Sequence, residues 1–199
     1  KGFNTGTHDW EKVEFTIDPA KPVQSVDIYG VFRNKTGKVW FDDLTIEEYP
    51  ANLLQNSSLE AGEDGIAGWS AWDKGFSVAD TDGLGNSSAA RMENTSGDGE
   101  YGLLQTVVLD RDENRPILIR GWSKAQDVSG TADNGYSLYA DIYYDDGTAS
   151  WGNYIPFDTG THDWQNKLLY FKPEKPIKSI SVYALFRYHT GTVWFDNIS

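Results

Sequence analysis

The sequence FDTGTHDWQNKLLYFKPEKPIKSISVYALFRYHTGTVWFDNIS, residues 157–199, determines how this chain is organised, because a related copy stands at residues 3–45. An offset of 154 positions aligns the two segments without a gap, and 20 of the 43 pairs are identical. The shared motifs are Thr-Gly-Thr-His-Asp-Trp at 5–10 and 159–164, and Val-Trp-Phe-Asp at 39–42 and 193–196. Repetition at the spacing of a whole domain is typical of tandem modules.

The repeat divides the chain of 199 residues into two parts. We predict one complete module at residues 51–199 and the C-terminal part of a preceding similar module at residues 1–50. About 50 residues are too few to bury a stable core alone. We therefore expect residues 1–50 to fold only against strands of an upstream segment or against another copy of the chain.

Composition and local patterning indicate an all-β fold. The sequence has 20 glycines, 14% aromatic residues and many scattered turn-forming residues. It shows no long stretch with a period of 3.6 residues, and its short alternating stretches predict strands joined by turns. Alternation over 26–32 and the run 39–46 predict strands in the first copy. The motif Asp-Asp-Gly-Thr at 145–148 predicts a turn.

Charge excludes some partners from the prediction. The formal net charge of -13 argues against nucleic acid and against anionic bilayers, since both would repel the chain at long range. No run of 18 apolar residues is present, so no membrane span is expected. An acidic, aromatic-rich chain with no cysteine fits a bacterial protein that is secreted or displayed on the cell surface.

Counting by twos along the predicted strands of the complete module separates two faces. One face is aliphatic and is the expected core of a two-sheet sandwich: Leu138, Ala140, Ile142, Ile180, Val182, Ala184 and Phe186. The other face mixes rings with charges and is expected to face solvent: Arg120, Trp122, Lys124, Tyr139, Asp141, Tyr143, Tyr183 and Arg187. So many large amphipathic side chains exceed what solubility requires.

The mixed face suggests a ligand-binding platform. An aromatic ring offers a flat apolar plate to the C–H face of a sugar, and neighbouring charged and phenol groups can bond its hydroxyls. Trp151, in the predicted loop after 145–148, is a further candidate contact. The alternative is that these side chains cover the sheet or pack against a neighbouring module of the same parent chain.

The residues predict no catalytic centre. His8 and His162 each precede an aspartate and a tryptophan in a turn, where such side chains commonly bond local backbone. No nucleophile or third metal ligand accompanies them, and His189 is expected to be exposed. No phosphate loop, zinc-protease motif or nucleophile elbow is present. We therefore predict that this chain is not an enzyme.

The module resembles bacterial carbohydrate-binding modules of families 4, 9 and 22. The resemblance rests on Asn-Ser-Ser-Leu-Glu at 56–60 followed by Gly68-Trp69, on the motif at 160–165 and on Val-Trp-Phe-Asp-Asn at 193–197. It implies a calcium-containing antiparallel jelly roll that accompanies glycoside hydrolases or surface enzymes. By the same resemblance, Glu60 near the start and Asp196 near the end would hold a structural Ca²⁺, an ion that prefers oxygen ligands.

These observations together predict a non-catalytic module that binds a polysaccharide or oligosaccharide. The alternative function is a structural spacer or adhesin repeat that binds no sugar. Solvent-exposed rings on the mixed face favour the glycan-binding function, and a face covered by a neighbouring module favours the structural function.

Overall fold

The chain divides into two compact units, Lys1–Tyr49 and Pro50–Ser199, which we call the N-terminal unit and the sandwich unit. The residues described by this computed structural model are 1–13, 15, 17, 23–46, 52–62, 67–109 and 115–199. The predicted boundary between residues 50 and 51 falls within 47–51, outside the described residues.

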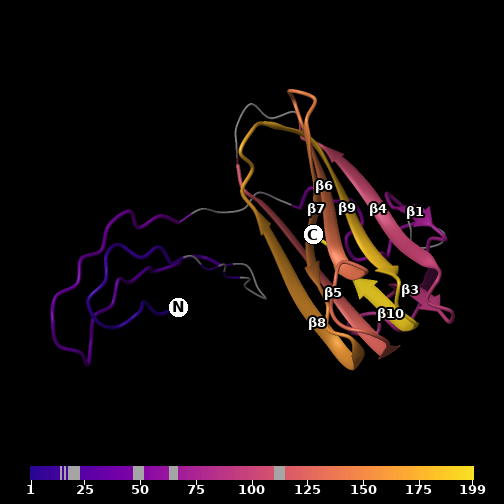
Figure 1. Ribbon diagram of the computed structural model, residues 1–199, viewed down its shortest axis with the longest axis horizontal. Coiled ribbons are helices and arrows are strands. Elements are labelled where there is room, and N and C mark those ends of the chain that lie inside the picture. The colour runs from indigo at the N-terminus through magenta and orange to yellow at the C-terminus, as the bar shows by residue number, and fades with distance from the viewer. Residues whose placement is uncertain (14, 16, 18–22, 47–51, 63–66, 110–114) are drawn as a thin grey trace. The chain divides into compact units, whose positions relative to one another are not determined.

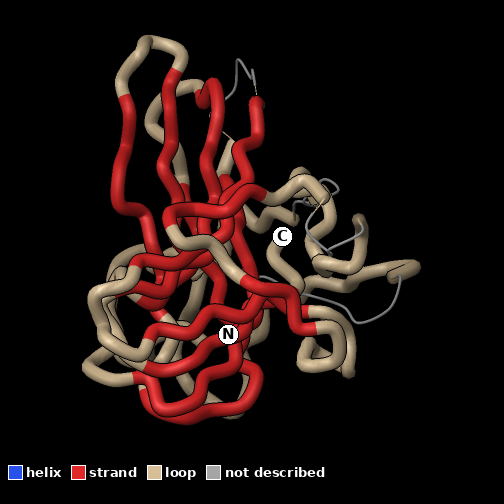
Figure 2. The backbone as a smooth tube through the Cα atoms, turned by 90° about the vertical axis from the view of Figure 1, so that its right-hand side faces the viewer, coloured by secondary structure: helices blue, strands red, loops and turns tan. Residues whose placement is uncertain are grey.

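All regular secondary structure among the described residues is β-strand, and it lies in the sandwich unit. The strands are β1 (Ser70–Asp73), β2 (Ser77–Ala79), β3 (Ala89–Asn94), β4 (Glu100–Val108), β5 (Ile117–Val128), β6 (Tyr136–Tyr144), β7 (Ala149–Pro156), β8 (Gly160–Phe171), β9 (Ile177–Arg187) and β10 (Gly191–Asp196). Figure 2 shows these strands as the long red segments, with loops between them.

The strands form two five-stranded antiparallel sheets that face each other (Figure 1). The first sheet has the order β1-β4-β9-β6-β7, and the second has the order β2-β3-β10-β5-β8. Strands that follow one another along the chain mostly alternate between sheets, as in a jelly roll. The predicted all-β, two-sheet jelly-roll class is confirmed.

The core lies between the two sheets and contains the predicted aliphatic set. In the first sheet β6 pairs with β9 so that Leu138 lies opposite Ala184 and Ala140 opposite Val182. All seven predicted positions have exposed fractions of 3% or less. Burying a large apolar side chain contributes about 1.5–3 kcal/mol, so this face accounts for much of the stability of the sandwich.

Turn chemistry connects β6 to β7 as predicted. The backbone N–H of Tyr144 donates to the carbonyl of Thr148 at 2.9 Å, which closes the loop. Gly147 takes a positive φ of 81°, a conformation that costs glycine little because it has no Cβ. The hairpin positions Tyr143 and Trp151 on neighbouring strands.

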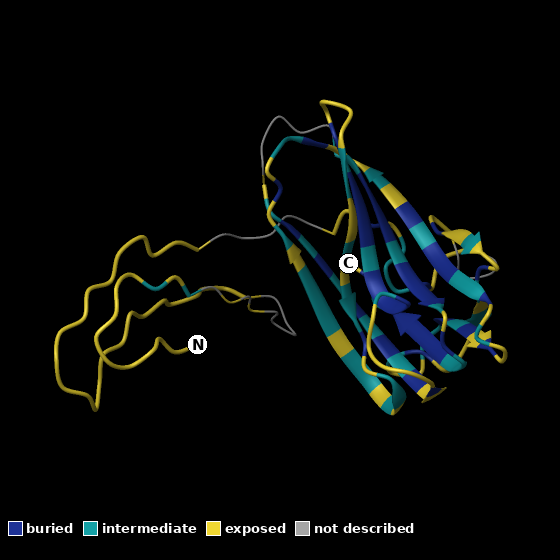
Figure 3. Ribbon diagram, in the orientation of Figure 1, coloured by how far each residue is buried: buried dark blue, intermediate teal, exposed yellow. Residues whose placement is uncertain are grey.

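The N-terminal unit has no strand among its described residues. Nearly all of those residues are exposed, as the yellow trace in Figure 3 shows. The strands predicted over 26–32 and 39–46 are therefore not formed. Strands need hydrogen-bonding neighbours, and no neighbouring strand is provided for this segment among the described residues.

Candidate functional site

Rings gather on the outer face of the first sheet, the side turned away from the core. In β6 and β9 the residues between the core positions point to this side, and Tyr139 lies directly opposite Tyr183. Outer positions of β1 and β7 extend the face. We call this surface the ring-lined face: Trp72, Tyr139, Asp141, Tyr143, Trp151, Tyr154, Tyr183 and Arg187.

Edge-to-face contacts hold the rings of this face. The ring centroids of Tyr139 and Tyr183 are 5.7 Å apart with an interplanar angle of 81°. Trp72 meets Tyr183 at 6.4 Å and 86°. This geometry is favourable for aromatic pairs and restricts ring motion. The ring-lined face is therefore a preorganised surface.

Trp72 joins the face through β1, a placement that the sequence analysis did not predict. Trp72 is paired with Gly102 of β4, and a Cβ added to Gly102 would meet the Trp72 ring at 3.1 Å. The absent side chain of Gly102 leaves room for the indole of Trp72 to approach the backbone of β4. A glycine inside an apolar strand was the available sequence signal, since such a glycine often marks a close approach.

Arg187 lies at the centre of the ring cluster. Its guanidinium carbon is 5.6 Å from the Trp72 ring centroid and 5.9 Å from that of Tyr139. An ion pair of 3.7 Å joins Arg187 Nη1 to Glu100 Oε2, and the Arg187 side chain is only 15% exposed. Stacked between rings and paired with Glu100, this cation is held in one orientation.

Asp141 adds a carboxylate between the rings. Its exposed fraction is 9%, and the Gly152 N–H donates to it at 3.4 Å. Burial raises the pKa of the Tyr139 phenol, and the charge of Asp141 raises it further. Burial and Asp141 raise the pKa of Tyr183 in the same way. Both phenols therefore stay protonated at neutral pH and can act as hydrogen-bond donors.

The open part of the face lies at β7. Trp151 is 62% exposed and Tyr154 is 43% exposed. Trp151 contacts Tyr143 edge to face at 5.1 Å and 87°. Large rings with this exposure are available to an incoming ligand or partner.

The structure divides the predicted mixed face between the two sheets. Arg120, Trp122 and Lys124 are on β5, which pairs with β8 and β10 in the second sheet. They cannot share a platform with Tyr139 and Arg187 of the first sheet, so the expectation of one common face is wrong. The alternation of side chains along a strand predicts the side to which each residue points, but not the sheet to which the strand belongs.

Lys124 has a packing role in the second sheet. Its ammonium lies 4.6 Å from the Trp194 ring centroid and 5.3 Å from that of Trp164. It also donates a hydrogen bond to the Asp82 carbonyl at 3.1 Å. The lysine joins two tryptophans of different strands to the loop after β2.

The two predicted metal ligands lie near each other. Asp196 is fully buried, and its carboxylate accepts hydrogen bonds from Leu84 N at 2.9 Å and Ser87 Oγ at 3.1 Å. The Ser88 N–H donates to Glu60 at 2.7 Å. Burial raises the pKa of Asp196, and the nearby charge of Glu60 adds to this effect. No cationic side chain in the described parts of the chain pairs with Asp196.

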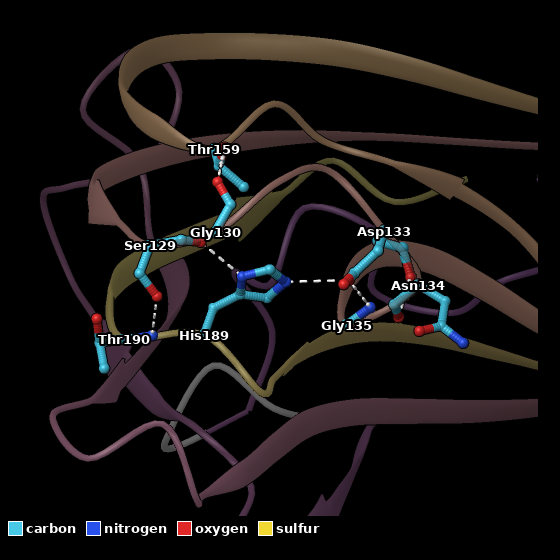
Figure 4. A network of polar contacts seen from close by, with 9 residues as sticks. Ser129, Gly130, Asp133, Asn134, Gly135, Thr159, His189 and Thr190 are labelled. Carbon is cyan, nitrogen blue, oxygen red and sulfur yellow. Dashed lines mark hydrogen bonds and ion pairs between the residues drawn. The ribbon is translucent and has the colours of Figure 1, made fainter.

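The histidines have structural contacts. His162 Nδ1 contacts the Asp163 carbonyl at 2.8 Å and Nε2 contacts the Asp158 carbonyl at 2.9 Å, so the predicted contacts with local backbone are present. The expected turn is wrong, because His162 lies within β8. The expectation that His189 is exposed is wrong, because only 3% of it is exposed. His189 joins the Ser129 carbonyl at 2.6 Å to Asp133 at 3.0 Å (Figure 4). It closes the loop between β5 and β6.

Neither a membrane-spanning helix nor a cluster of metal-ligating side chains is found among the described residues. No helix in the part of the chain that the structure describes is long and apolar enough to cross a membrane. Over the same residues, no group of three or more acidic, histidine or cysteine side chains is arranged to hold a metal ion.

Solved structures support the fold. The chain is similar to a family 16 carbohydrate-binding module, with a TM-score of 0.52 and 19% identity over 74% of this chain and 98% of that one. It is also similar to the N-terminal modules of endo-1,4-β-D-xylanase 10B from Clostridium thermocellum, with a TM-score of 0.53 and 14% identity over 71% and 27%. At this identity the likeness shows the jelly-roll fold alone.

Relatives found by sequence similarity are nucleases rather than carbohydrate-binding proteins. No protein-family model matches the chain. The tRNA nuclease WapA of Bacillus subtilis strain 168 is 31% identical over 206 residues, which cover 97% of this chain and 9% of the relative. The tRNA(Glu)-specific nuclease WapA of Bacillus subtilis subsp. natto is 32% identical, over 97% and 8%. The chain therefore spans less than a tenth of the length of these relatives.

These relatives overturn several predictions. They are named as tRNA nucleases, which contradicts the predicted function as a non-catalytic glycan-binding module, with its spacer alternative, and the role as a glycoside hydrolase accessory domain. The expectation of no enzyme and the exclusion of nucleic acid as a partner are contradicted by the same names. The charge argument failed for a physical reason: long-range repulsion depends on the charge of the whole molecule, whereas the sequence has the charge of one segment.

Proposed function

We propose that the protein to which this chain belongs cleaves tRNA, and that this chain is a β-sandwich segment of it. The observation that carries the proposal is the similarity to WapA tRNA nucleases over 97% of the chain at 31% identity. The alignment includes both the N-terminal unit and the sandwich unit. The activity belongs to a protein much longer than this chain, and the segment contributes a surface to it.

Within such a protein, the ring-lined face is the surface of this segment best suited to contact unpaired bases. Single-stranded parts of an RNA are commonly held by stacking on aromatic side chains and guanidinium groups. Trp151 and Tyr154 offer exposed rings, and Arg187 lies among the rings behind them. Glu100 and Asp141 make the surface unfavourable for phosphates, so the proposed contacts are with bases.

The proposal is tested by tRNA cleavage with the full-length natural protein. Tyr154→Ala removes a ring of 43% exposure from the ring-lined face. Tyr170→Ala is the matched control, because Tyr170 is also 43% exposed but lies on β8 of the second sheet. Removing one stacked ring weakens RNA binding by about 1–3 kcal/mol, so Tyr154→Ala should raise the KM for tRNA at least several-fold.

The two parts of the proposal fail in different ways. A full-length protein that leaves every tRNA intact contradicts the proposed activity. A protein that cleaves tRNA equally well with Tyr154→Ala and Tyr170→Ala contradicts only the role of the face.

We propose separately that Glu60 and Asp196 hold a structural Ca²⁺. A fully buried carboxylate with a second carboxylate nearby and no cationic partner is unfavourable unless a cation compensates it. Oxygen ligands from carboxylates, backbone carbonyls and water are those that Ca²⁺ prefers. The two side chains fit such an ion, with the remaining ligands coming from backbone and water.

Chelation tests this site. Removing the ion leaves the charges of Glu60 and Asp196 facing each other, so a chelator should lower the melting temperature and added CaCl₂ should restore it. Glu60→Gln should show a smaller response to both reagents. A melting curve that is unchanged by excess chelator, with no heat of Ca²⁺ binding in calorimetry, refutes the site.

A further inference from the structure

The N-terminal unit exposes side chains that the sandwich unit buries at equivalent positions. Phe32 is 42% exposed and Val26 is 46% exposed. At an offset of 154 residues their counterparts, Phe186 and Ile180, are 0% and 3% exposed. Figure 3 shows the contrast in colour: the N-terminal trace is mostly yellow, whereas the strands of the sandwich unit are largely dark blue and teal. The N-terminal unit therefore has the apolar face of a core but no covering partner among the described residues.

Backbone turns of the two copies have the same conformation. Positive φ angles occur at paired positions along both segments, and such angles are uncommon in residues other than glycine. The pairs are Gly6 (96°) and Gly160 (88°), Asn34 (55°) and Tyr188 (61°), Gly37 (122°) and Gly191 (123°), and Asp43 (49°) and Asn197 (47°). The N-terminal unit thus has the turns of β8–β10 without their strand partners.

Local hydrogen bonds also match between the copies. His8 Nε2 contacts the Asn4 carbonyl at 3.0 Å, and His162 Nε2 contacts the Asp158 carbonyl at 2.9 Å. The N–H of each following tryptophan is bonded to the aspartate before it, at 2.9 Å in one copy and 2.8 Å in the other. These contacts set the course of the chain at the same point of both copies.

Two packing contacts of the sandwich core have counterparts in the N-terminal unit. The Phe3 and Phe41 rings meet at 5.9 Å and 64°, whereas Phe157 and Phe195 meet at 5.7 Å and 73°. A Cβ added to Gly30 would lie 3.1 Å from the Phe41 ring, so the segments equivalent to β9 and β10 already pack on each other. The packing is that of a sandwich from which the other strands are missing.

The sandwich unit shows which strands complete this arrangement. There β9 lies between β4 and β6, and β10 lies between β3 and β5. A partner for the N-terminal unit must therefore supply strands on both sides of two segments. Strands with the order and spacing of residues 70–156 meet this requirement.

We propose that the exposed apolar face of the N-terminal unit binds a polypeptide segment with the strand pattern of residues 70–156, and that the two together close a second jelly-roll sandwich. The partner is another segment of the same long protein. A second copy of this chain does not fit, because its own β3–β6 are already paired with its β9 and β10. The relatives are more than ten times as long as the matched region, so they have sequence outside it. This inference rests on the proposal that the chain belongs to a protein much longer than itself, but not on the cleavage of tRNA.

The test adds the proposed partner to the full chain. A copy of residues 51–156 is fused directly before residue 3, which keeps the spacing found before residue 157. Amide hydrogen exchange is then measured in residues 26–32 and 39–42 of the extended chain and of the original chain. Formation of buried strands should slow exchange there by about 100-fold or more. No slowing in the extended chain overturns the proposal.

A pair of aspartate substitutions in the extended chain shows whether the expected face makes the contact. Phe32→Asp places a charge where Phe186 is fully buried, so exchange over 26–32 should return to the rate of the original chain. Gln24→Asp is the control, because its counterpart Lys178 is exposed and the protection should be kept. Equal effects of both substitutions overturn the assigned face.

Sedimentation of the original chain decides between partners. A monomer with fast exchange over 26–32 agrees with a partner elsewhere in the long protein. A dimer with slow exchange in the same residues means that a second copy covers the face, and this overturns the assigned partner.

Discussion

Replacing the equivalent phenylalanine of each copy by alanine should have very different effects on the free energy of unfolding. Phe186 is fully buried between the sheets and meets the Tyr136 ring edge to face at 5.8 Å. Its removal loses the transfer free energy of the ring, leaves a cavity and breaks this aromatic pair. Phe186→Ala should therefore lower the free energy of unfolding of the sandwich unit by about 3–5 kcal/mol.

Phe32→Ala makes the identical chemical change at the equivalent position of the N-terminal unit. Phe32 is 42% exposed, and a residue with this exposure leaves no large cavity when it is truncated. The main unfolding transition should move by no more than about 0.5 kcal/mol. In the extended chain described above the same substitution should become costly, because the ring is then buried.

Urea unfolding followed by tryptophan fluorescence and far-ultraviolet circular dichroism measures both effects. The corresponding fall in melting temperature for Phe186→Ala is roughly 6–20 °C for a unit of this size. Equal shifts for Phe186→Ala and Phe32→Ala in the original chain would refute the difference in burial on which the reasoning rests.

Two further predictions concern buried polar groups. The Ser123 hydroxyl donates to the Trp194 carbonyl at 2.8 Å, so the Tyr136 hydroxyl must donate to Ser123 at 2.6 Å. Ser123→Ala leaves that buried donor without an acceptor, so it should lower the free energy of unfolding by about 1–3 kcal/mol in denaturant. Tyr136→Phe should lower it by less, roughly 0.5–1.5 kcal/mol. The reverse order would contradict this bonding scheme. Burial alone would raise the pKa of Asp133, but hydrogen bonds from His189 and Gly135 outweigh it and lower this pKa. The resulting stability is present above the unfolded-state pKa of about 3.9 and is lost as the pH falls through the lower folded-state value. Asp133→Asn should therefore weaken the acid dependence of the unfolding midpoint between pH 7 and 2, and a profile identical to that of the natural protein would exclude this contribution.

Local periodicity was sufficient for the fold class and for the core. Leu138, Ala140 and Ile142 alternate with polar or aromatic residues, and a strand of period two must place them on one side. The internal repeat was likewise visible without coordinates, since a repeated segment needs only to be compared with itself. The turn at 145–148 followed from the conformational preference of glycine and aspartate.

Position within the sheets was decided by tertiary structure. Trp122 and Tyr139 have the same alternating pattern, yet one strand joins the second sheet and the other joins the first. Trp72 reaches the ring-lined face only because β1 pairs beside Gly102, and His189 is buried only because a distant loop closes over it. Strand pairing joins residues far apart in the chain, and the free energy that selects one pairing comes from contacts between whole sheets rather than from any single stretch of sequence.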